Sequence, residues 1–373
     1  MNTWQNCKKI LCIRPDNMGD LLMTTPAIRA LKHTFNAQIT VLTSSMAAGI
    51  ARNIPEIDDI MVFDVPWVKS DQAAPNDTFA AITEDIKNRQ FDAAIIFTVY
   101  SQNPLPTVML AYLANIPLRL AYCRENPYQL LTHWQPDKEP YQFIKHQVRR
   151  DLDLVATVGA HTHDEHLSLQ VPDVWPQLRQ KLQQENINPD KPWLIMHPGV
   201  SEPKREYPSA QWAEVACTAV EHLGYQVLFT GSGSEREMVA GIQSSVGKQC
   251  FNMAGKLSLD EFIYLLAHAP LVVSVNTGTI HIAAATGTPT VVLYALTNPQ
   301  HTPWMVPSQV LSYNIPAETR SKNEVIAHVN HYFDQQPTDV PCPDDVIAAI
   351  KSLLNPEPVA VMLNTPQNAS ATI

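Results

Sequence analysis

Residues 274–285 read Ser-Val-Asn-Thr-Gly-Thr-Ile-His-Ile-Ala-Ala-Ala and decide the fold of this chain. The apolar run from Pro270 to Val273 before them is typical of a buried parallel strand, and the small residues near their end predict a helix. Residues 277–279 therefore fall at a strand-to-helix turn, where free backbone N–H groups and the helix dipole favour an anion. Gly278 lets the backbone approach a phosphate closely. His281 follows within about one helical turn, so the stretch predicts a nucleotide diphosphate site.

Strand and helix patterns alternate along the chain, which predicts an α/β protein with parallel sheets and crossover helices. We expect two Rossmann-like domains, 1–171 and 172–354, that face each other across a ligand cleft, and a disordered Pro-rich tail over 355–373. A long loop is expected over 126–142. The expected strands are Ile10–Ile13, Ile39–Leu42, Ile60–Phe63, Ala93–Phe97, Leu118–Ala121, Trp193–Met196, Gln226–Phe229, Leu271–Val275 and Thr290–Tyr294.

Composition limits the function classes. The chain has 373 residues, 45% of them hydrophobic, and a net charge of −10 that disfavours nucleic-acid binding. Its six cysteines form no C-x-x-C pair, so neither a disulfide framework nor a zinc site is expected. We expect a cytoplasmic protein without a signal peptide or membrane span, whose membrane contact, if it has one, is peripheral.

A first chemical constellation, Arg14-Pro-Asp-Asn-Met-Gly-Asp20, follows the first expected strand. Open α/β sheets place ligands at the carboxyl ends of their strands, which favours Asp20 as a general base. The alternative is that Asp20 caps the following helix, a role that aspartate often takes. The residues alone leave both interpretations open.

Two further constellations lie in the second half. The stretch that starts at His197 carries Lys204 after an expected strand, so it is either a solvated loop or a cation for a diphosphate. The stretch that ends at Glu235 is Gly-rich but fits no phosphate-loop pattern. Glu235 either caps a helix or accepts hydrogen bonds from a ribose or base.

A basic cluster stands out in the first half of this acidic chain. It is either a solvated helix face or a landing site for an anionic acceptor or membrane surface. Its candidate acceptor-binding residues are Arg119, Arg124, Lys145 and Arg149.

Three histidines lie close together at His161, His163 and His166. Their spacing fits neither H-E-x-x-H nor a zinc finger, so we interpret the segment as a solvated connector and expect no metal there.

Together these motifs resemble glycosyltransferase family 9, the bacterial heptosyltransferases of lipopolysaccharide core assembly. The resemblance runs from about Lys9 to Trp304. It rests on Met18-Gly-Asp20, the His197-Pro-Gly loop with Lys204, the Gly-rich stretch ending at Glu235, and Asn276-Thr-Gly-Thr-Ile-His281. It implies the GT-B architecture and an inverting transfer from an ADP-heptose-like nucleotide sugar to a saccharide or glycolipid acceptor. It also implies that neither a metal nor another cofactor is needed.

By the same resemblance, Asp20 is the base on the acceptor hydroxyl, and the second half binds the donor. The implied donor-binding residues are Lys204, Glu235, Asn276, Thr277, Gly278, Thr279 and His281. The family usually carries Asp where this chain has Asn276. Because the two side chains share a shape, we expect the fold to tolerate either and the donor preference to depend on the choice.

Three alternatives stay open: transfer from another nucleotide sugar, a GT-B-fold nucleotide-sugar epimerase without an acceptor, and a non-catalytic nucleotide-binding protein. A Rossmann dehydrogenase is disfavoured because the first strand-to-helix turn lacks G-x-G-x-x-G.

Overall fold

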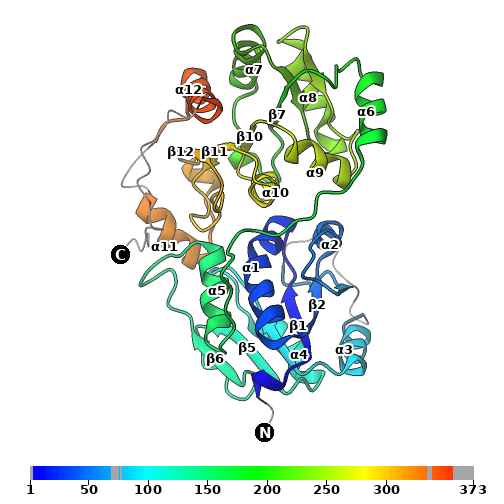
Figure 1. Ribbon diagram of the computed structural model, residues 1–373. Helices are drawn as coiled ribbons and strands as arrows, with labels where there is room; N and C mark the ends of the chain where they lie inside the picture. The colour runs from blue at the N-terminus through cyan, green and yellow to red at the C-terminus, as the bar shows by residue number, and fades with distance from the viewer. Residues whose placement is uncertain (1–2, 69–74, 76–77, 334–337, 356–373) are drawn as a thin grey trace. The chain divides into compact units, whose positions relative to one another are not determined.

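The computed structural model describes residues 3–68, 75, 78–333 and 338–355. The chain divides into two compact units, one running to Leu169 and the other starting at Gln170 (Figure 1). Apart from Asn355, the predicted C-terminal tail lies outside the described residues.

The first unit is built on a six-stranded parallel sheet in the order β3-β2-β1-β4-β5-β6. Its core strands are short apolar runs that the sheet buries on both faces, as crossover connections require. Helix α1 contacts α2 and α5, while α3 and α4 contribute to the core that includes Ile13 of β1. The elements are β1 (Lys9–Arg14), α1 (Met18–Phe35), β2 (Gln38–Thr43), α2 (Ser45–Ala51), β3 (Asp59–Val62), α3 (Thr78–Arg89), β4 (Ala93–Ile96), α4 (Leu105–Leu113), β5 (Leu118–Cys123), β6 (His133–Pro136) and α5 (Gln147–Ala156), after a 3₁₀ turn at Trp4–Asn6.

The second unit repeats the design with a sheet in the order β12-β11-β10-β7-β8-β9, again parallel throughout the described pairs. Helices α7, α8 and α12 contribute to a large core cluster of this unit. The elements are α6 (Trp175–Gln184), β7 (Trp193–His197), η2 (Pro203–Arg205), α7 (Ser209–Leu223), β8 (Gln226–Phe229), η3 (Gly233–Glu235), α8 (Arg236–Ser244), β9 (Cys250–Asn252), α9 (Leu259–Ala267), β10 (Val272–Val275), α10 (Gly278–Thr286), β11 (Thr290–Ala295), β12 (Ser308–Tyr313), η4 (Ala317–Thr319), α11 (Glu324–Phe333) and α12 (Pro343–Leu354).

The deciding stretch folds as its residues predict. Val272–Val275 form the buried strand β10, and α10 begins at Gly278. The helix ends at Gly287, which has a φ of +74° and suits the left-handed position that closes many helices. The α/β class and both Rossmann-like sheets are confirmed.

The expectation of a long loop over 126–142 is wrong in part, because β6 forms at His133–Pro136. The strand pairs with β5, and the Trp134 indole donates to the Cys123 carbonyl at 2.8 Å. Its side chains are half-buried or exposed, so the strand lacks the apolar run that would reveal it in a sequence. The edge strand β12 was missed for the same reason.

Candidate functional site

Each unit has a topological switch point, where consecutive connections leave neighbouring strands in opposite directions. In strand order it lies between β1 and β4 in the first unit and between β7 and β10 in the second. Open α/β sheets bind ligands beyond the carboxyl ends of the strands at such points. Asp20 follows β1, Lys204 follows β7 and Asn276 follows β10. Most of the predicted site residues therefore lie at one of the two switch points.

The base candidate Asp20 is held by an arginine from the end of β1. Arg14 is completely buried, and its Nη2 donates to Asp20 Oδ1 at 3.0 Å. The Asp20 side chain keeps 13% of its surface exposed, so the carboxylate is fixed and still reachable by a ligand. The N-cap residue of α1 is Asn17, and Asp20 lies in the first turn. The hypothesis that Asp20 is the N-cap is therefore wrong.

Two more carboxylates surround Arg14. Its Nε lies 3.0 Å from Asp16 Oδ2, and Asp151 on α5 is close enough to act on Arg14 electrostatically. Burial, partly offset by Arg14, raises the pKa of Asp16 and of Asp151 to about 6 in each case. Asp151 also accepts hydrogen bonds from Thr24 and Gln147. The sequence interpretation assigned no role to Arg14, Asp16 or Asp151, although a charged pair directly after a buried strand is a usable signal.

In the second unit, the loop after β7 reaches the start of α10. Arg205 Nη1 donates to the Asn276 carbonyl at 3.3 Å, although the two residues are 71 positions apart. Lys204, the neighbour of Arg205 in η2, has its Nζ 3.2 Å from Glu202 Oε2. The structure thus brings the predicted cation onto the same edge as the predicted phosphate-binding turn. Sequence reasoning missed Arg205 because its contact depends on the fold.

Asn276 is almost fully buried, and its amide group is already engaged. Nδ2 donates to the Ala295 carbonyl at 3.1 Å and to Thr297 Oγ1 at 3.3 Å. A carbonyl can only accept, which fixes the orientation of the amide. Asn276 Oδ1, an acceptor, and Thr277 Oγ1, a hydroxyl that can donate or accept, are buried with no hydrogen-bond partner among the residues the structure describes. Two such atoms at a helix start suit the polar groups of a bound ligand.

These hydrogen bonds predict, against the expectation from side-chain shape, that the fold is less stable with Asp at this position. In Asn276→Asp a carboxylate oxygen faces the Ala295 carbonyl, where the amide now donates. We expect a loss of about 1–3 kcal/mol in the free energy of unfolding, measured by urea denaturation at pH 7.5. The matched control is Asn298→Asp, because Asn298 uses its oxygen to accept from the Gln300 N–H at 2.9 Å. Equal stability losses in both variants would contradict this account.

Glu235 caps its helix, which is one of the two roles that the sequence left open for it. It closes a capping box with Ser232, and its Oε2 accepts from the Ser232 N–H at 2.6 Å. Its carboxylate lies against Gly199, where a Cβ atom would come within 2.2 Å of Oε1. Burial lowers the pKa of the nearby His197 to about 4, so this imidazole is neutral at pH 7. The cap does not exclude a ligand contact, because a carboxylate offers several acceptor positions.

The predicted acceptor residues divide into two kinds. Arg119 is buried near the start of β5 and donates to the carbonyls of Ile116, Gln129 and Leu130. It lies at the opposite end of the sheet from Asp20, so its predicted acceptor role is not supported. Arg124 at the carboxyl end of β5 donates to the carbonyls of Tyr100 and Glu139.

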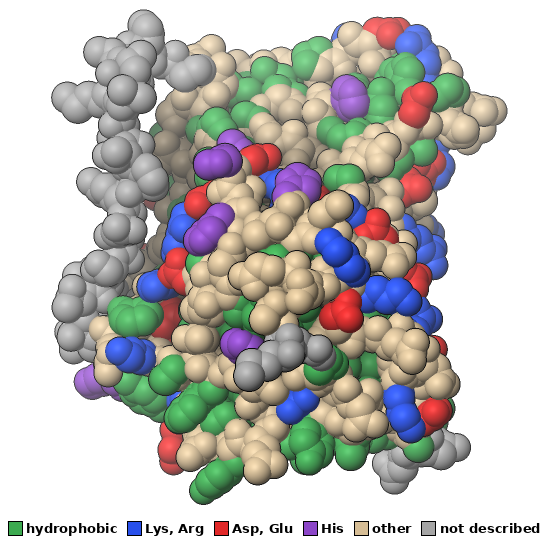
Figure 2. Space-filling model, turned by 60° about the horizontal axis from the view of Figure 1, so that its bottom comes forward, with side chains coloured by type: hydrophobic (Ala, Val, Ile, Leu, Met, Phe, Trp, Pro, Cys, Tyr) green, Lys and Arg blue, Asp and Glu red, His purple; other side chains and the backbone are tan. Residues whose placement is uncertain are grey.

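Lys145 and Arg149 are more exposed, but each has an acidic partner, Asp153 and Glu165 respectively. Acidic and basic side chains are interspersed across the face shown in Figure 2. Lys145 and Arg149 therefore belong to ion pairs whose partly exposed side chains can exchange partners for a ligand.

The histidine segment is held in place by Arg29. The guanidinium donates to the carbonyls of Asp164 and His166 at 2.9 Å each and pairs with Glu56 at 2.8 Å. Among the described residues no group of three His, Cys, Asp or Glu side chains could hold a metal ion. Arg29 of α1 thus anchors the segment through its backbone carbonyls. These contacts fit the predicted role of a connector.

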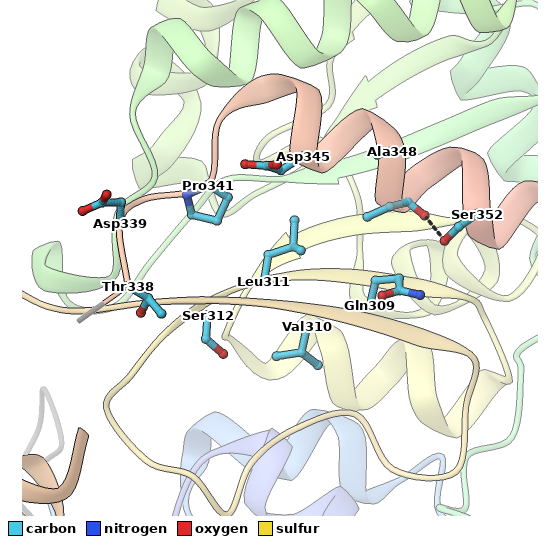
Figure 3. Close-up of a pocket in the computed structure, with 11 residues that line it drawn as sticks. Gln309, Val310, Leu311, Ser312, Thr338, Asp339, Pro341, Asp345, Ala348 and Ser352 are labelled. Atoms are coloured by element: carbon cyan, nitrogen blue, oxygen red, sulfur yellow. Dashed lines mark hydrogen bonds between the residues drawn. The ribbon is translucent and has the colours of Figure 1, made fainter. Parts of the chain in front are cut away.

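A separate pocket of about 650 Å³ lies between β12 and α12 (Figure 3). Edge-strand residues such as Leu311 line one side, and Asp345 and Ser352 of α12 line the other. None of the predicted donor residues lines it. The pocket is therefore distinct from the switch point of the second unit.

The fold matches solved glycosyltransferases. A family 9 glycosyltransferase from Veillonella parvula superposes with a TM-score of 0.75 at 18% identity and covers 95% of this chain and 99% of that one. The ADP-heptose lipopolysaccharide heptosyltransferase II of Escherichia coli superposes with a TM-score of 0.69 at 22% identity, covering 93% and 98%. Two Rossmann-like units of this kind define the GT-B fold.

The sequence narrows this class to a family. Residues 79–330 match the model of glycosyltransferase family 9 (heptosyltransferase). Lipopolysaccharide heptosyltransferase 2 of Escherichia coli K12 is 26% identical over 309 residues, which cover 79% of this chain and 85% of that protein. Lipooligosaccharide heptosyltransferase 2 of Haemophilus influenzae is 25% identical over 307 residues, with the same coverage. The chain belongs to glycosyltransferase family 9, and it is a glycosyltransferase enzyme.

Proposed function

We propose that this enzyme transfers heptose from ADP-heptose to the growing core of lipopolysaccharide or lipooligosaccharide, with inversion at the anomeric carbon and without a metal ion. The observation that carries the proposal is the convergence of η2 on the start of α10 through Arg205 and Asn276. It gives the second unit two cations and a helix N-terminus at one edge, which suit a nucleoside diphosphate. Similarity to several lipopolysaccharide and lipooligosaccharide heptosyltransferases supports heptose as the sugar.

In the proposed reaction the acceptor hydroxyl attacks the anomeric carbon in a single displacement. Asp20 takes the hydroxyl proton, the new glycosidic bond forms as the bond to the diphosphate breaks, and ADP leaves with the negative charge. Lys204 and the free N–H groups at residues 278 and 279 stabilise that charge. Thr277, His281 and Glu235 complete the donor site, with Glu235 near the ribose or base.

We place acceptor binding on the first unit, with Lys145 and Arg149 as the candidate anion contacts. A glycolipid acceptor places the enzyme at the cytoplasmic side of a membrane in peripheral contact. No helix in the described part of the chain is long and apolar enough to cross a bilayer.

The donor site is tested by Lys204→Ala. A charge-assisted contact to a phosphate is worth about 1.5–3 kcal/mol, so we expect roughly 10- to 150-fold weaker ADP binding in isothermal calorimetry. Lys191→Ala is the control, because Lys191 precedes β7 and lies away from the carboxyl ends of the strands. Unchanged affinity in a folded Lys204→Ala protein would remove Lys204 from the donor site.

Metal independence is tested by chelation. We expect EDTA to leave the rate of ADP release unchanged, because a lysine and backbone amides replace the usual cation on the diphosphate. A rate that disappears with EDTA and returns with Mg²⁺ or Mn²⁺ would show that this part of the proposal is wrong.

A further inference from the structure

The carboxylates around Arg14 carry more negative charge than one guanidinium can neutralise. Three carboxylates, those of Asp16, Asp20 and Asp151, act on a guanidinium with no exposed surface. They come from three elements: the loop after β1, helix α1 and helix α5. Arg150 is close enough to act on Asp151, but it is itself bound by two other carboxylates. A buried surplus of negative charge is costly, so a structural role alone gives no reason to keep it.

Two acidic side chains, Asp16 and Asp20, contact different nitrogens of the Arg14 guanidinium. Arg14 Nε lies 3.0 Å from Asp16 Oδ2 in an ion pair without hydrogen-bond geometry, and Nη2 donates to Asp20 Oδ1 at 3.0 Å. The guanidinium is planar and rigid, so the attraction of Asp16 for its Nε side acts on the orientation of the whole group. Asp16 thus helps to hold the guanidinium that contacts Asp20.

Asp16 is itself held firmly. Gln102, which follows β4, donates to Asp16 Oδ1, and Ser44 donates to the Asp16 carbonyl at 2.6 Å. Thr43 at the end of β2 donates to the Arg14 carbonyl at 2.8 Å. Groups at the carboxyl ends of the two strands that flank β1 therefore fix the chain segment that carries the pair. Such pre-organisation is typical of a reacting group that must be placed accurately.

We propose that Arg14 and Asp16 are positioning residues for the reaction: Asp16 orients the Arg14 guanidinium, which holds Asp20 toward the acceptor hydroxyl, and the charge of Asp16 keeps Arg14 from weakening Asp20 as a base. The inference rests on the proposed role of Asp20 as that base. Neither residue touches the substrate in this mechanism, so each acts on the rate through Asp20.

The sign of the pH effect follows from the charges. The charged groups that act on Asp20 include Arg14, which favours its ionised form, and Asp16, which opposes it, while Asp151 acts on Arg14. Replacing Asp16 by a neutral residue leaves the positive charge of Arg14 less compensated. The acidic limb of the profile of kcat against pH, where Asp20 becomes protonated, then moves to lower pH. The rate on the plateau above it falls, because a more acidic Asp20 carboxyl is a weaker base.

The test compares kcat and KM of Arg14→Lys, Asp16→Asn and wild type from pH 4.5 to 9, with ADP-heptose and lipopolysaccharide from a strain that lacks core heptose. Lysine keeps the charge of Arg14 but cannot hold two acids in a fixed plane, so we expect kcat to fall about 10- to 100-fold. We expect the acidic limb of Asp16→Asn to move down by roughly 0.5–1 pH unit. The donor KM should stay within about threefold in both.

Glu56→Gln is the matched control, because it breaks another buried pair of the same unit, Arg29 with Glu56, whose Arg29 lies nine residues from Asp20 along α1. It should lower the melting temperature without moving the pH profile. Gln102→Ala is the milder variant in case Asp16→Asn does not fold, and it should shift the limb in the same direction, since Gln102 stabilises the charged form of Asp16.

The outcomes separate the inference from the proposed function. If folded Arg14→Lys and Asp16→Asn, or Gln102→Ala in place of the latter, keep the wild-type kcat and pH profile while Asp20→Asn is inactive, the positioning role is wrong and the base assignment stands. If Asp20→Asn turns over normally, the base assignment itself fails. A loss of kcat in Arg14→Lys with the expected shift in Asp16→Asn supports the inference.

Discussion

Asp20→Asn should abolish transfer while leaving ADP binding within a few fold of wild type. Loss of a general base typically costs about 10²- to 10⁴-fold in rate, and the amide cannot take up the hydroxyl proton. Asp20 sits on α1 of the first unit, whereas the proposed ADP contacts all lie in the second, so the donor site should be intact. Initial rates of ADP release and calorimetric titration with ADP measure the two effects.

Asn17→Ala is the control for this variant, since it replaces the N-cap residue of the same helix, whose side chain makes no capping hydrogen bond. It should turn over at close to the wild-type rate. Near-normal turnover by folded Asp20→Asn would contradict the assignment of the base.

The substitution Arg150→Met should have the second large effect, a loss in the free energy of unfolding. Arg150 is buried on α5 and binds both oxygens of Asp137 at 2.9 Å and Glu139 Oε2 at 2.6 Å. Its guanidinium also lies 4.5 Å from the centre of the Tyr122 ring. Removing it leaves two buried carboxylates without their main partner, and breaking a pair of this kind costs about 3–5 kcal/mol. We expect a large drop in the urea midpoint followed by circular dichroism.

Arg149→Met provides the comparison on the same helix. Arg149 has a partner in Glu165, but about a third of its side chain is exposed, and exposed pairs contribute about 0–1 kcal/mol. If the two variants lose equal stability, the burial of Arg150 does not have the importance we assign to it.

Periodicity and strand signals predicted the two sheets because parallel strands in such folds are buried on both faces. Val272–Val275 of β10 is a buried run of this kind, apolar except for Ser274, and α10 begins soon after it, at Gly278. The strands that were missed, such as His133–Pro136, lie at sheet edges, where one side of the strand is open and the pattern disappears. Sequence alone identified the centres of both sheets but only one of their four edge strands, β3.

The location of the candidate site was predictable where motif residues follow a strand, as with Asp20 and Asn276, whose roles stay predictions. It was not predictable where the contact joins distant segments. Asp151 reaches the Arg14 cluster only because α5 packs against α1, and Arg205 reaches Asn276 across 71 residues. Arg119 shows the opposite error. Its charge suggested that it binds an anionic acceptor, but in the fold its side-chain nitrogens donate hydrogen bonds to backbone carbonyls.

The most direct test of the central claim is to incubate the enzyme with ADP-heptose of known anomeric configuration, lipopolysaccharide from a strain that lacks core heptose, and EDTA. The product linkage is then determined by nuclear magnetic resonance. The account predicts one heptose added per acceptor, with the anomeric configuration opposite to that of the donor, and a matching amount of ADP. Retention of configuration, or conversion of the nucleotide sugar in the absence of acceptor, would contradict it.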